Sequence, residues 1–243
     1  MAHLQSHKCC NIIAAALFVI SLASAGPPAL AEDIYKPAIN PADFTTAITN
    51  PYFSMPVGKT MVYEGLTNEG IKRIEIRIPG ETKTVMGVKT LIYWDRVWLN
   101  GKIHEDTRDY ISQDRDGNVW YFGEAVDNYE NGKIVNHDGA WEAGVDGAMP
   151  GIWIKAKQIA GDSYRQEYAK GAAEDWARVV AVGESVATSA KRFTDCAKIY
   201  EWDALDPDTK EHKYYCPAAG GVVLIEDLES GERTELIKVE TGG

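Results

Sequence analysis

The chain has 243 residues and carries 25 Lys and Arg against 36 Asp and Glu, so its formal net charge is −11. This acidic balance disfavours nucleic acids and anionic membrane surfaces as partners, because phosphate binding needs a basic face. The negative field suits either solubility outside the cytoplasm or the attraction of cations and basic partners.

The N-terminal segment predicts export. Lys8 lies in a short polar head, an apolar run extends from Asn11 to Ser24, and Ala29-Leu30-Ala31 fits an A-x-A cleavage site. The apolar run is short for a bilayer span, so we interpret residues 1–31 as a cleaved signal peptide rather than an anchor. We expect residues 32–243 to form a single β-rich domain that is periplasmic or secreted, without membrane insertion.

A short helix is expected near the start of the mature chain. Asn40-Pro41 fits an N-cap followed by the first helical residue, and Asp43 lies early in the first turn. We therefore predict a helix from Pro41 to Thr49, which ends before the Asn50-Pro51 break.

From Lys59 onward the sequence favours strands. The segment Ile71–Ile78 alternates apolar and charged residues, which is typical of a half-buried strand. Asn100-Gly101 predicts a tight hairpin, and Asn131-Gly132 predicts a second one. The expected strands lie at residues 60–66, 71–78, 82–86, 88–99, 102–112, 118–122, 126–130, 133–137, 163–168, 178–182, 193–203, 209–216, 222–228 and 234–240.

The segment Asp138–Gly161 has the composition of a long ordered loop. It contains five glycines and Pro150, together with Trp141 and Trp153. Loops of this length are usually functional or disordered. The fold class that we predict is all-β: an antiparallel β-barrel or strongly curved half-barrel, with a short N-terminal helix and this one long loop covering an opening.

Two cysteines remain after cleavage, and their spacing predicts a disulfide. The turn sequence Leu205–Asp208 would place Cys196 directly opposite Cys216 in a hairpin. An even cysteine count in an exported chain supports the same bond. Two free thiols, or a metal site that uses His212, are the alternatives.

The first candidate metal site follows from the Asn100-Gly101 hairpin. An unbroken two-residue turn would place Asp95 opposite Asp106, with His104 next in the row. Two opposed carboxylates destabilise a sheet unless a cation or a shared proton compensates, so this arrangement favours a hard cation or an acid–base pair. The alternatives are solvent exposure at an edge and a register shifted by one residue.

A second candidate metal site lies in the run from Asp114 to Asn118. Asp114, Asp116 and Asn118 alternate like part of a calcium-binding loop, and Glu124 and Asp127 are possible further ligands. The run lacks the downstream glycine and glutamate spacing of an EF-hand, and a tight turn would use the same residues. The cofactor that these patterns suggest is a divalent cation such as calcium.

Candidate ligand-binding residues at the start of the long segment and within it are His137, Trp141, Glu142 and Asp146, and Glu174 and Asp175 are further acidic candidates. A carboxylate pair can run glycoside hydrolysis, and aromatic residues can line a pocket, although they more often fill a β core. The spacing of histidines and cysteines does not match standard zinc sites. Nucleotide-binding and serine-hydrolase motifs are also missing.

Several runs resemble a widespread family of exported bacterial proteins of uncharacterised activity. They are NPYFSMPVGKTMVYEG (50–65), DGNVWYFGE (116–124), WEAGVDGAMPGI (141–152), GDSYRQEYAKGAAED (161–175) and EHKYY (211–215). The resemblance covers nearly the whole mature chain and implies a shared fold without an assigned activity. Residues 216–221 depart from the family's usual A-P-G-V-G, so the resemblance implies that Cys216 is particular to this chain. Curved antiparallel strands in an exported protein are also similar to lipid-carrier domains, by fold analogy alone.

These observations predict an exported, non-catalytic protein that binds a small ligand or a metal cation. The alternative is a carboxylate-dependent hydrolase acting on a polysaccharide or an ester. A third interpretation is a structural envelope protein without a ligand.

Overall fold

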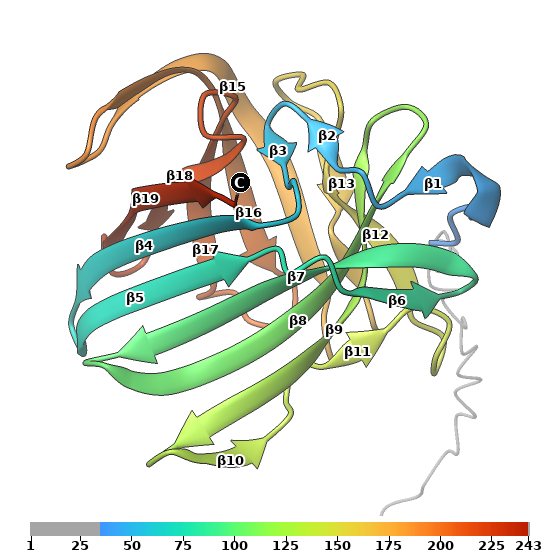
Figure 1. Cartoon of the computed structure of the whole chain (residues 1–243), viewed down its shortest axis with the longest axis horizontal. Helices are drawn as coiled ribbons and strands as arrows, with labels where there is room; N and C mark the ends of the chain where they lie inside the picture. Colours follow the sequence, from blue (N-terminus) through green and yellow to red (C-terminus); the bar gives the residue numbers. More distant parts are fainter. Residues whose placement is uncertain (1–34, 243) are drawn as a thin grey trace, which may run out of the picture. The chain divides into compact units, whose positions relative to one another are not determined.

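The computed structural model describes residues 35–242, and the expected signal peptide lies outside them. The described part forms 19 β-strands and a single 3-10 turn, which confirms an all-β antiparallel fold. Figure 1 shows the long strands wrapping around a common interior. Within residues 35–242, no helix has the length and apolarity that a bilayer crossing requires.

One half of the barrel consists of five long strands, each paired antiparallel with the next (Figure 1). They are β4 (Lys59–Thr67), β5 (Gly70–Arg77), β7 (Val88–Leu99), β8 (Lys102–Asp114) and β9 (Val119–Glu130). The short β6 (Thr82–Val85) pairs with the start of β7. The alternation predicted for β5 is present, because Ile74 and Ile76 are buried. The two strands expected at 118–122 and 126–130 are one continuous strand, β9.

Both Asn-Gly hairpins are confirmed. Asn100 and Gly101 have φ angles of 50° and 76°, and Asn131 and Gly132 have φ angles of 51° and 75°. Two successive positive φ angles define the type I′ turn that matches the twist of paired strands. The second turn joins β9 to β10 (Lys133–Asn136).

The segment Asp138–Gly161 is part of the barrel wall, and the prediction of one long covering loop is wrong. It contains β11 (Trp141–Glu142) and β12 (Met149–Ile154), which both pair with β9. The free edge of β9 carries unpaired backbone groups, and these short strands satisfy them. The glycines that suggested a loop include Gly144 and Gly147, which lie in the turn between the two strands.

The other half of the barrel contains seven strands. β13 (Ser163–Arg165) pairs with β15 and β14 (Glu167–Tyr168) pairs with β12, so one short segment joins the two halves. β19 pairs with β4 on the far side, and the pairings therefore make a nearly closed barrel. The remaining strands are β15 (Asp175–Ala187), β16 (Arg192–Asp203), β17 (Lys210–Cys216), β18 (Gly221–Asp227) and β19 (Arg233–Thr241).

The helix predicted from Pro41 to Thr49 is reduced to the 3-10 turn Pro41–Asp43. Asn40 does cap this turn, because its side chain accepts a hydrogen bond from the Ala42 amide at 3.4 Å. A short helix is costly to nucleate, and β-branched residues follow the turn. The chain instead forms the three short strands β1 (Phe44–Thr45), β2 (Thr49–Asn50) and β3 (Phe53–Ser54).

The β2–β3 hairpin packs a phenylalanine into one end of the barrel. The Phe53 ring is 1% exposed and lies 5.6 Å from the Tyr93 ring and 5.2 Å from the Trp153 ring, between centroids. The buried Lys59 amino group donates hydrogen bonds to the carbonyl oxygens of Ser54 and Gly220 at 2.7 and 2.8 Å. These bonds tie the hairpin to the barrel wall.

The predicted disulfide and its register are confirmed. Ala197 lies opposite Tyr215 in the β16–β17 hairpin, and Cys196 and Cys216 are bonded with their Cα atoms 4.2 Å apart. Because both cysteines are in this bond, they are neither free thiols nor ligands of a metal site with His212.

Removing the disulfide should lower the stability of the fold. The Cys196→Ala/Cys216→Ala variant is expected to lose about 3 kcal/mol in free energy of unfolding, because the bond closes a loop of about 20 residues in the unfolded chain. Urea unfolding of the variant and of the oxidised wild type measures the difference. Equal midpoints and slopes would contradict the expectation.

Candidate functional site

A β-bulge shifts the register of the first hairpin. Trp98 lies opposite Ile103, as expected for an unbroken two-residue turn. Val97, however, lies opposite Glu105, which leaves His104 as the additional residue. A one-residue shift exchanges the two faces of every later position. The alternative of a shifted register, left open by the sequence, is the one that the structure adopts.

Asp95 and Asp106 consequently lie on opposite faces of the sheet, and the predicted carboxylate pair is wrong. Asp95 lies opposite Thr107, and Asp106 lies opposite Arg96. Asp95 lines an interior cavity. The Asp106 carboxylate accepts hydrogen bonds from the Trp94 indole and from Arg108 on the outer face, at 2.8 and 3.0 Å.

His104 is exposed near the turn end of the barrel, so the structure does not bring Asp95, Asp106 and His104 together. Within residues 35–242, no three His, Cys, Asp or Glu side chains converge as metal ligands. Metal binding therefore stays a prediction without a preformed ligand set in this part of the chain.

The Asp114–Asn118 run forms a tight turn. The Asp114 carboxylate accepts hydrogen bonds from the backbone N–H of Asn118 at 2.8 Å and from the side-chain amide of Asn118 at 2.8 Å. It accepts a third from the Trp120 indole at 2.7 Å. The Asn118 side-chain oxygen accepts a hydrogen bond from the Ala156 amide at 2.9 Å. Asp116 is exposed. The Asp114 and Asn118 oxygens that were proposed to hold calcium thus stabilise the turn and the neighbouring chain.

The four candidates in the long segment do not form one site. The His137 ring nitrogen Nδ1 lies 2.7 Å from the Val126 carbonyl oxygen, and Glu142 forms an ion pair with Lys83 at 2.6 Å. Asp146 is exposed in a turn. Trp141 is buried, and its ring packs edge-on against Tyr121 with centroids 5.4 Å apart. The Trp141 position agrees with the alternative that aromatic residues fill the core.

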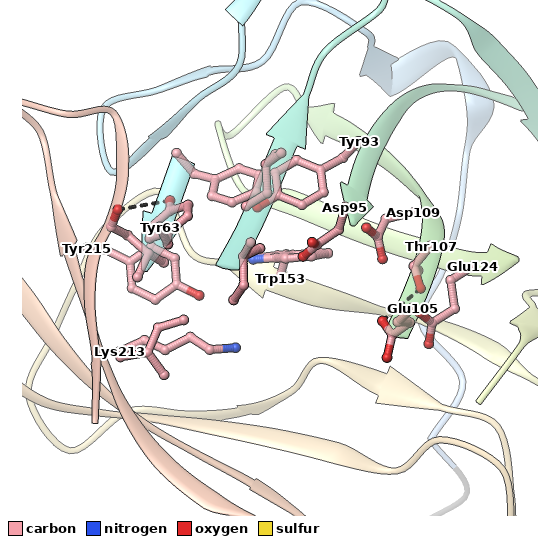
Figure 2. A pocket seen from close by; sticks show the side chains of 15 residues that line it. Tyr63, Tyr93, Asp95, Glu105, Thr107, Asp109, Glu124, Trp153, Lys213 and Tyr215 are labelled. Carbon is pink, nitrogen blue, oxygen red and sulfur yellow. Dashed lines mark hydrogen bonds between the residues drawn. The ribbon is translucent and has the colours of Figure 1, made fainter. Parts of the chain in front are cut away.

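The barrel encloses a cavity of about 190 Å³ that has an acidic side and an aromatic side. Figure 2 shows Asp95, Asp109, Glu105 and Glu124 gathered on one side, with Lys213 across from them. These carboxyl groups come from β7, β8 and β9, at positions whose side chains point inward. The aromatic residues that line the cavity are Phe53, Tyr63, Tyr93, Trp153 and Tyr215.

A second cavity of about 100 Å³ adjoins the first, since Trp153 and Lys213 line both. Glu167 from β14, Asp175 from β15 and Glu201 from β16 line this second cavity. The two cavities together are lined by seven carboxyl groups and one lysine. The carboxyl groups belong to Asp95, Glu105, Asp109, Glu124, Glu167, Asp175 and Glu201.

Lys213 is already paired with carboxylates. Its amino group lies 2.8 Å from Glu201 and 2.8 Å from Glu211, and Tyr215 donates a hydrogen bond to Glu201 at 2.8 Å. Burial lowers the pKa of Lys213, but these two carboxylates outweigh it, so its pKa lies well above the usual value. Lys213 therefore stays charged and is neutralised within its own cluster.

Three carboxyl groups on the opposite side, those of Asp95, Asp109 and Glu124, have raised pKa values and hold protons more tightly than usual. Burial raises the pKa of Asp95 to about 7, and Glu105 adds to the effect. Burial raises the pKa of Glu124 to about 8. It also raises the pKa of Asp109 well above its usual value, although the Tyr121 hydroxyl donates a hydrogen bond to this carboxylate.

The pKa values of Asp175 and Glu167, which line the second cavity, shift in the same direction. Burial raises the pKa of Asp175 to about 7, with Asp203 adding to it, and raises the pKa of Glu167 well above its usual value, with Glu124 adding to it. Perturbed pKa values that come from burial together with like charges are concentrated at functional sites.

Among the residues that line the two cavities, Asp95 is the one with a buried side-chain atom that has no hydrogen-bond partner. Its Oδ1 atom is buried and forms no hydrogen bond with any of residues 35–242. The neighbouring Thr107 hydroxyl donates its hydrogen bond to Glu105 at 2.9 Å instead. Buried polar atoms are nearly always hydrogen-bonded, and each exception calls for an explanation.

A vestibule of about 520 Å³ adjoins the acidic side of the interior. It lies where the β4–β5, β7–β8 and β18–β19 turns meet, with Asn68, Leu99 and Ser230 among its lining residues. Glu105 lines both the vestibule and the interior cavity. This end of the barrel is therefore the natural approach to the acidic residues.

The sequence predicted Glu124 and Asp175 only as members of other sites. Asp109, Glu167 and Glu201 were not predicted at any site. A signal for the interior does exist. Polar residues two positions from a buried residue share its face of a strand, as Glu201 does with Ile199. The bulge at His104 concealed which residues of β7 share the inward face of β8.

No model of a known protein family matches the chain, and no curated protein matches it. A comparison with solved structures found a distant likeness to the crystal structure of a "putative lipoprotein" from Parabacteroides distasonis ATCC 8503. The two share 16% sequence identity, with a TM-score of 0.42, over 78% of this chain and 98% of that one. At this distance the likeness identifies no shared site, and the resemblance to exported bacterial proteins stays a prediction.

The buried carboxyl groups should make the protein more stable in mild acid. Their pKa values are higher in the folded state than in the unfolded chain, so the folded state binds more protons between about pH 4 and pH 8. Stability should therefore fall as pH rises through this range. We expect the Tm at pH 5 to exceed that at pH 8 by at least roughly 6 °C. The Asp95→Asn/Glu124→Gln variant should flatten the profile, and a wild-type maximum near pH 8 would refute the expectation.

Replacing Asp114 tests whether this residue stabilises the turn or binds calcium. Asp114→Ala should lose about 1–3 kcal/mol in free energy of unfolding, because buried donors lose their acceptor. The loss should be the same with calcium and with a chelator, as measured by urea unfolding. Asp116→Ala is the matched control and should change stability by less than about 0.5 kcal/mol. A loss of stability that appears only when calcium is present would instead support calcium binding at this turn.

Proposed function

We propose that the protein is an exported, non-catalytic binding protein that holds a small molecule inside its barrel. The observation that carries the proposal is the interior cavity of about 190 Å³, whose lining includes Asp95 with its unpartnered oxygen. A barrel that only had to be stable would fill this space with apolar side chains, as small barrels usually do. Buried carboxyl groups without partners cost stability, and binding proteins accept that cost to keep a site ready.

Export is supported from two directions. The N-terminal sequence has the pattern of a signal peptide. The described domain contains the disulfide Cys196–Cys216, and such bonds persist in oxidising compartments outside the cytoplasm. The proposal therefore places the protein in the periplasm or outside the cell.

The size of the cavity limits the ligand. A volume of about 190 Å³ is below the roughly 300–1,000 Å³ of sites for drug-sized molecules. The aromatic rings of Phe53, Tyr93 and Trp153 pack against one another, with centroid distances of 5.2 to 5.6 Å, and form a firm apolar side. A compact molecule with an apolar part and one polar end suits this space.

A hydrolase is the second candidate, and one observation favours it. Burial raises the pKa of Glu124 to about 8, so this group is protonated at neutral pH beside Asp109, as a general acid requires. The cavity is too small for a sugar chain to lie between two carboxyl groups, which is the arrangement that glycoside hydrolysis needs. Any substrate would have to be a small ester. Turnover of small esters that disappears in Glu124→Gln, with the fold intact, would favour this candidate.

Native mass spectrometry of the exported wild-type protein tests the binding proposal. We expect a mass adduct that is released when the protein is denatured. Two variants fill the cavity from different strands: Ile76→Phe on β5 and Val222→Phe on β18, both of which replace lining residues. Each should keep the circular dichroism spectrum and lose the adduct. A wild type without adduct, or an adduct retained in both variants, would sink the proposal.

A further inference from the structure

We infer that the ligand of the interior cavity is a small organic cation with a protonated amine, and that its ammonium group is bound by Asp95. The inference rests on the proposed function, since it names the chemical class of the molecule held in the barrel. It is drawn from four features of the described residues: the charge of the lining, the unpartnered oxygen, the aromatic side and the spacing of the carboxyl groups.

The charge of the lining selects a cation. Seven carboxyl groups and one lysine line the two adjoining cavities. Lys213 is already shared between Glu201 and Glu211, each 2.8 Å away. It therefore cannot neutralise the carboxyl groups on the facing side, which Figure 2 shows across the cavity. An anionic ligand would meet repulsion from every ionised group there, whereas a cation would balance the charge of Asp95 whenever this carboxyl group is ionised.

The unpartnered oxygen locates the cationic group. Asp95 Oδ1 is buried and lacks a hydrogen-bond donor among residues 35–242, and Asp95 lines the cavity. Thr107, the residue opposite it on β8, gives its only hydroxyl proton to Glu105 at 2.9 Å. The missing partner is therefore a donor from within the cavity. An ammonium group brings three donors and a positive charge.

The aromatic side suits the rest of an organic cation. Trp153 and Tyr93 lie with ring centroids 5.3 Å apart, and both line the cavity together with Asp95. Aromatic faces attract cations and pack against alkyl chains, as in sites that recognise organic ammonium groups. An alkylamine would place its chain against these rings and its charge at Asp95.

The spacing of the carboxyl groups disfavours a bare metal ion. Calcium takes six to eight oxygen ligands at about 2.3–2.6 Å, which requires several carboxylates to converge on one point. No three acidic, histidine or cysteine side chains do so in the part of the chain that the structure describes. The carboxyl groups instead surround a space that can hold several atoms, which an organic cation would fill.

Isothermal titration calorimetry of the mature protein at pH 8 tests the inference with three probes of one chain length. They are 1,4-diaminobutane, the neutral 1,4-butanediol and the anionic succinate. We expect the diamine to bind at least about tenfold more tightly than the diol, and succinate not to bind. Asp95→Asn should lower the affinity for the diamine by about tenfold or more, because a neutral amide replaces the charged acceptor.

Two control variants keep the result interpretable. Asp208→Asn changes the same charge in an exposed turn and should leave diamine affinity unchanged. Ile76→Phe fills the cavity and should abolish binding, so the inference does not depend on Asp95→Asn alone. The inference is overturned if the diamine does not bind, if the diol or succinate binds as tightly, or if neither Asp95→Asn nor Ile76→Phe weakens the diamine.

The outcomes also separate this inference from the proposed function. If the mass adduct of the exported protein is displaced by the diol or succinate but not by the diamine, the cavity is a ligand site and the ligand class is wrong. If there is neither an adduct nor binding of any probe, both fail together.

Discussion

The structure depends on one electrostatic constraint: carboxyl groups from six strands face an interior in which Lys213 is the one lysine among the cavity-lining residues. Burying a carboxylate in a poorly hydrated space is costly unless it is paired, hydrogen-bonded or protonated. The barrel uses all three solutions. Glu201 is paired with Lys213, Asp109 accepts a hydrogen bond from Tyr121, and burial raises the pKa of Glu124 towards protonation at neutral pH.

Three contacts hold the barrel wall in place around these buried carboxyl groups. The disulfide Cys196–Cys216 links β16 and β17, next to the strand segments that carry Glu201 and Lys213. Lys59 ties the β2–β3 hairpin to the barrel, and Phe53 from that hairpin supports the aromatic side of the cavity. A firm wall keeps the like charges from relaxing apart, so the space between them persists.

The outer face of the barrel handles charge differently. Asp106 and Arg108 lie beside Trp94 on that face and are joined to each other by a hydrogen bond, and both Arg96 and Arg108 lie over the Trp94 ring. Glu75 pairs with Arg96 at 2.7 Å. These groups are partly hydrated and mutually compensated, so they contribute modestly to stability. The same residue types therefore have different consequences on the two faces of one strand, and only the inner set leaves an oxygen without a partner.

The sequence by itself determined the long strands of this protein, because strand alternation, Asn-Gly turns and cysteine spacing are local properties. The Asn100-Gly101 hairpin and the Cys196–Cys216 bond follow from them directly. Tertiary structure decided the site. The bulge at His104 turned Asp95 inward and Asp106 outward, and short-range patterns do not show on which side of a turn an extra residue will be absorbed. Asp95 and Glu167 reach one interior only because distant strands pair around the barrel, and that closure depends on contacts across the whole chain.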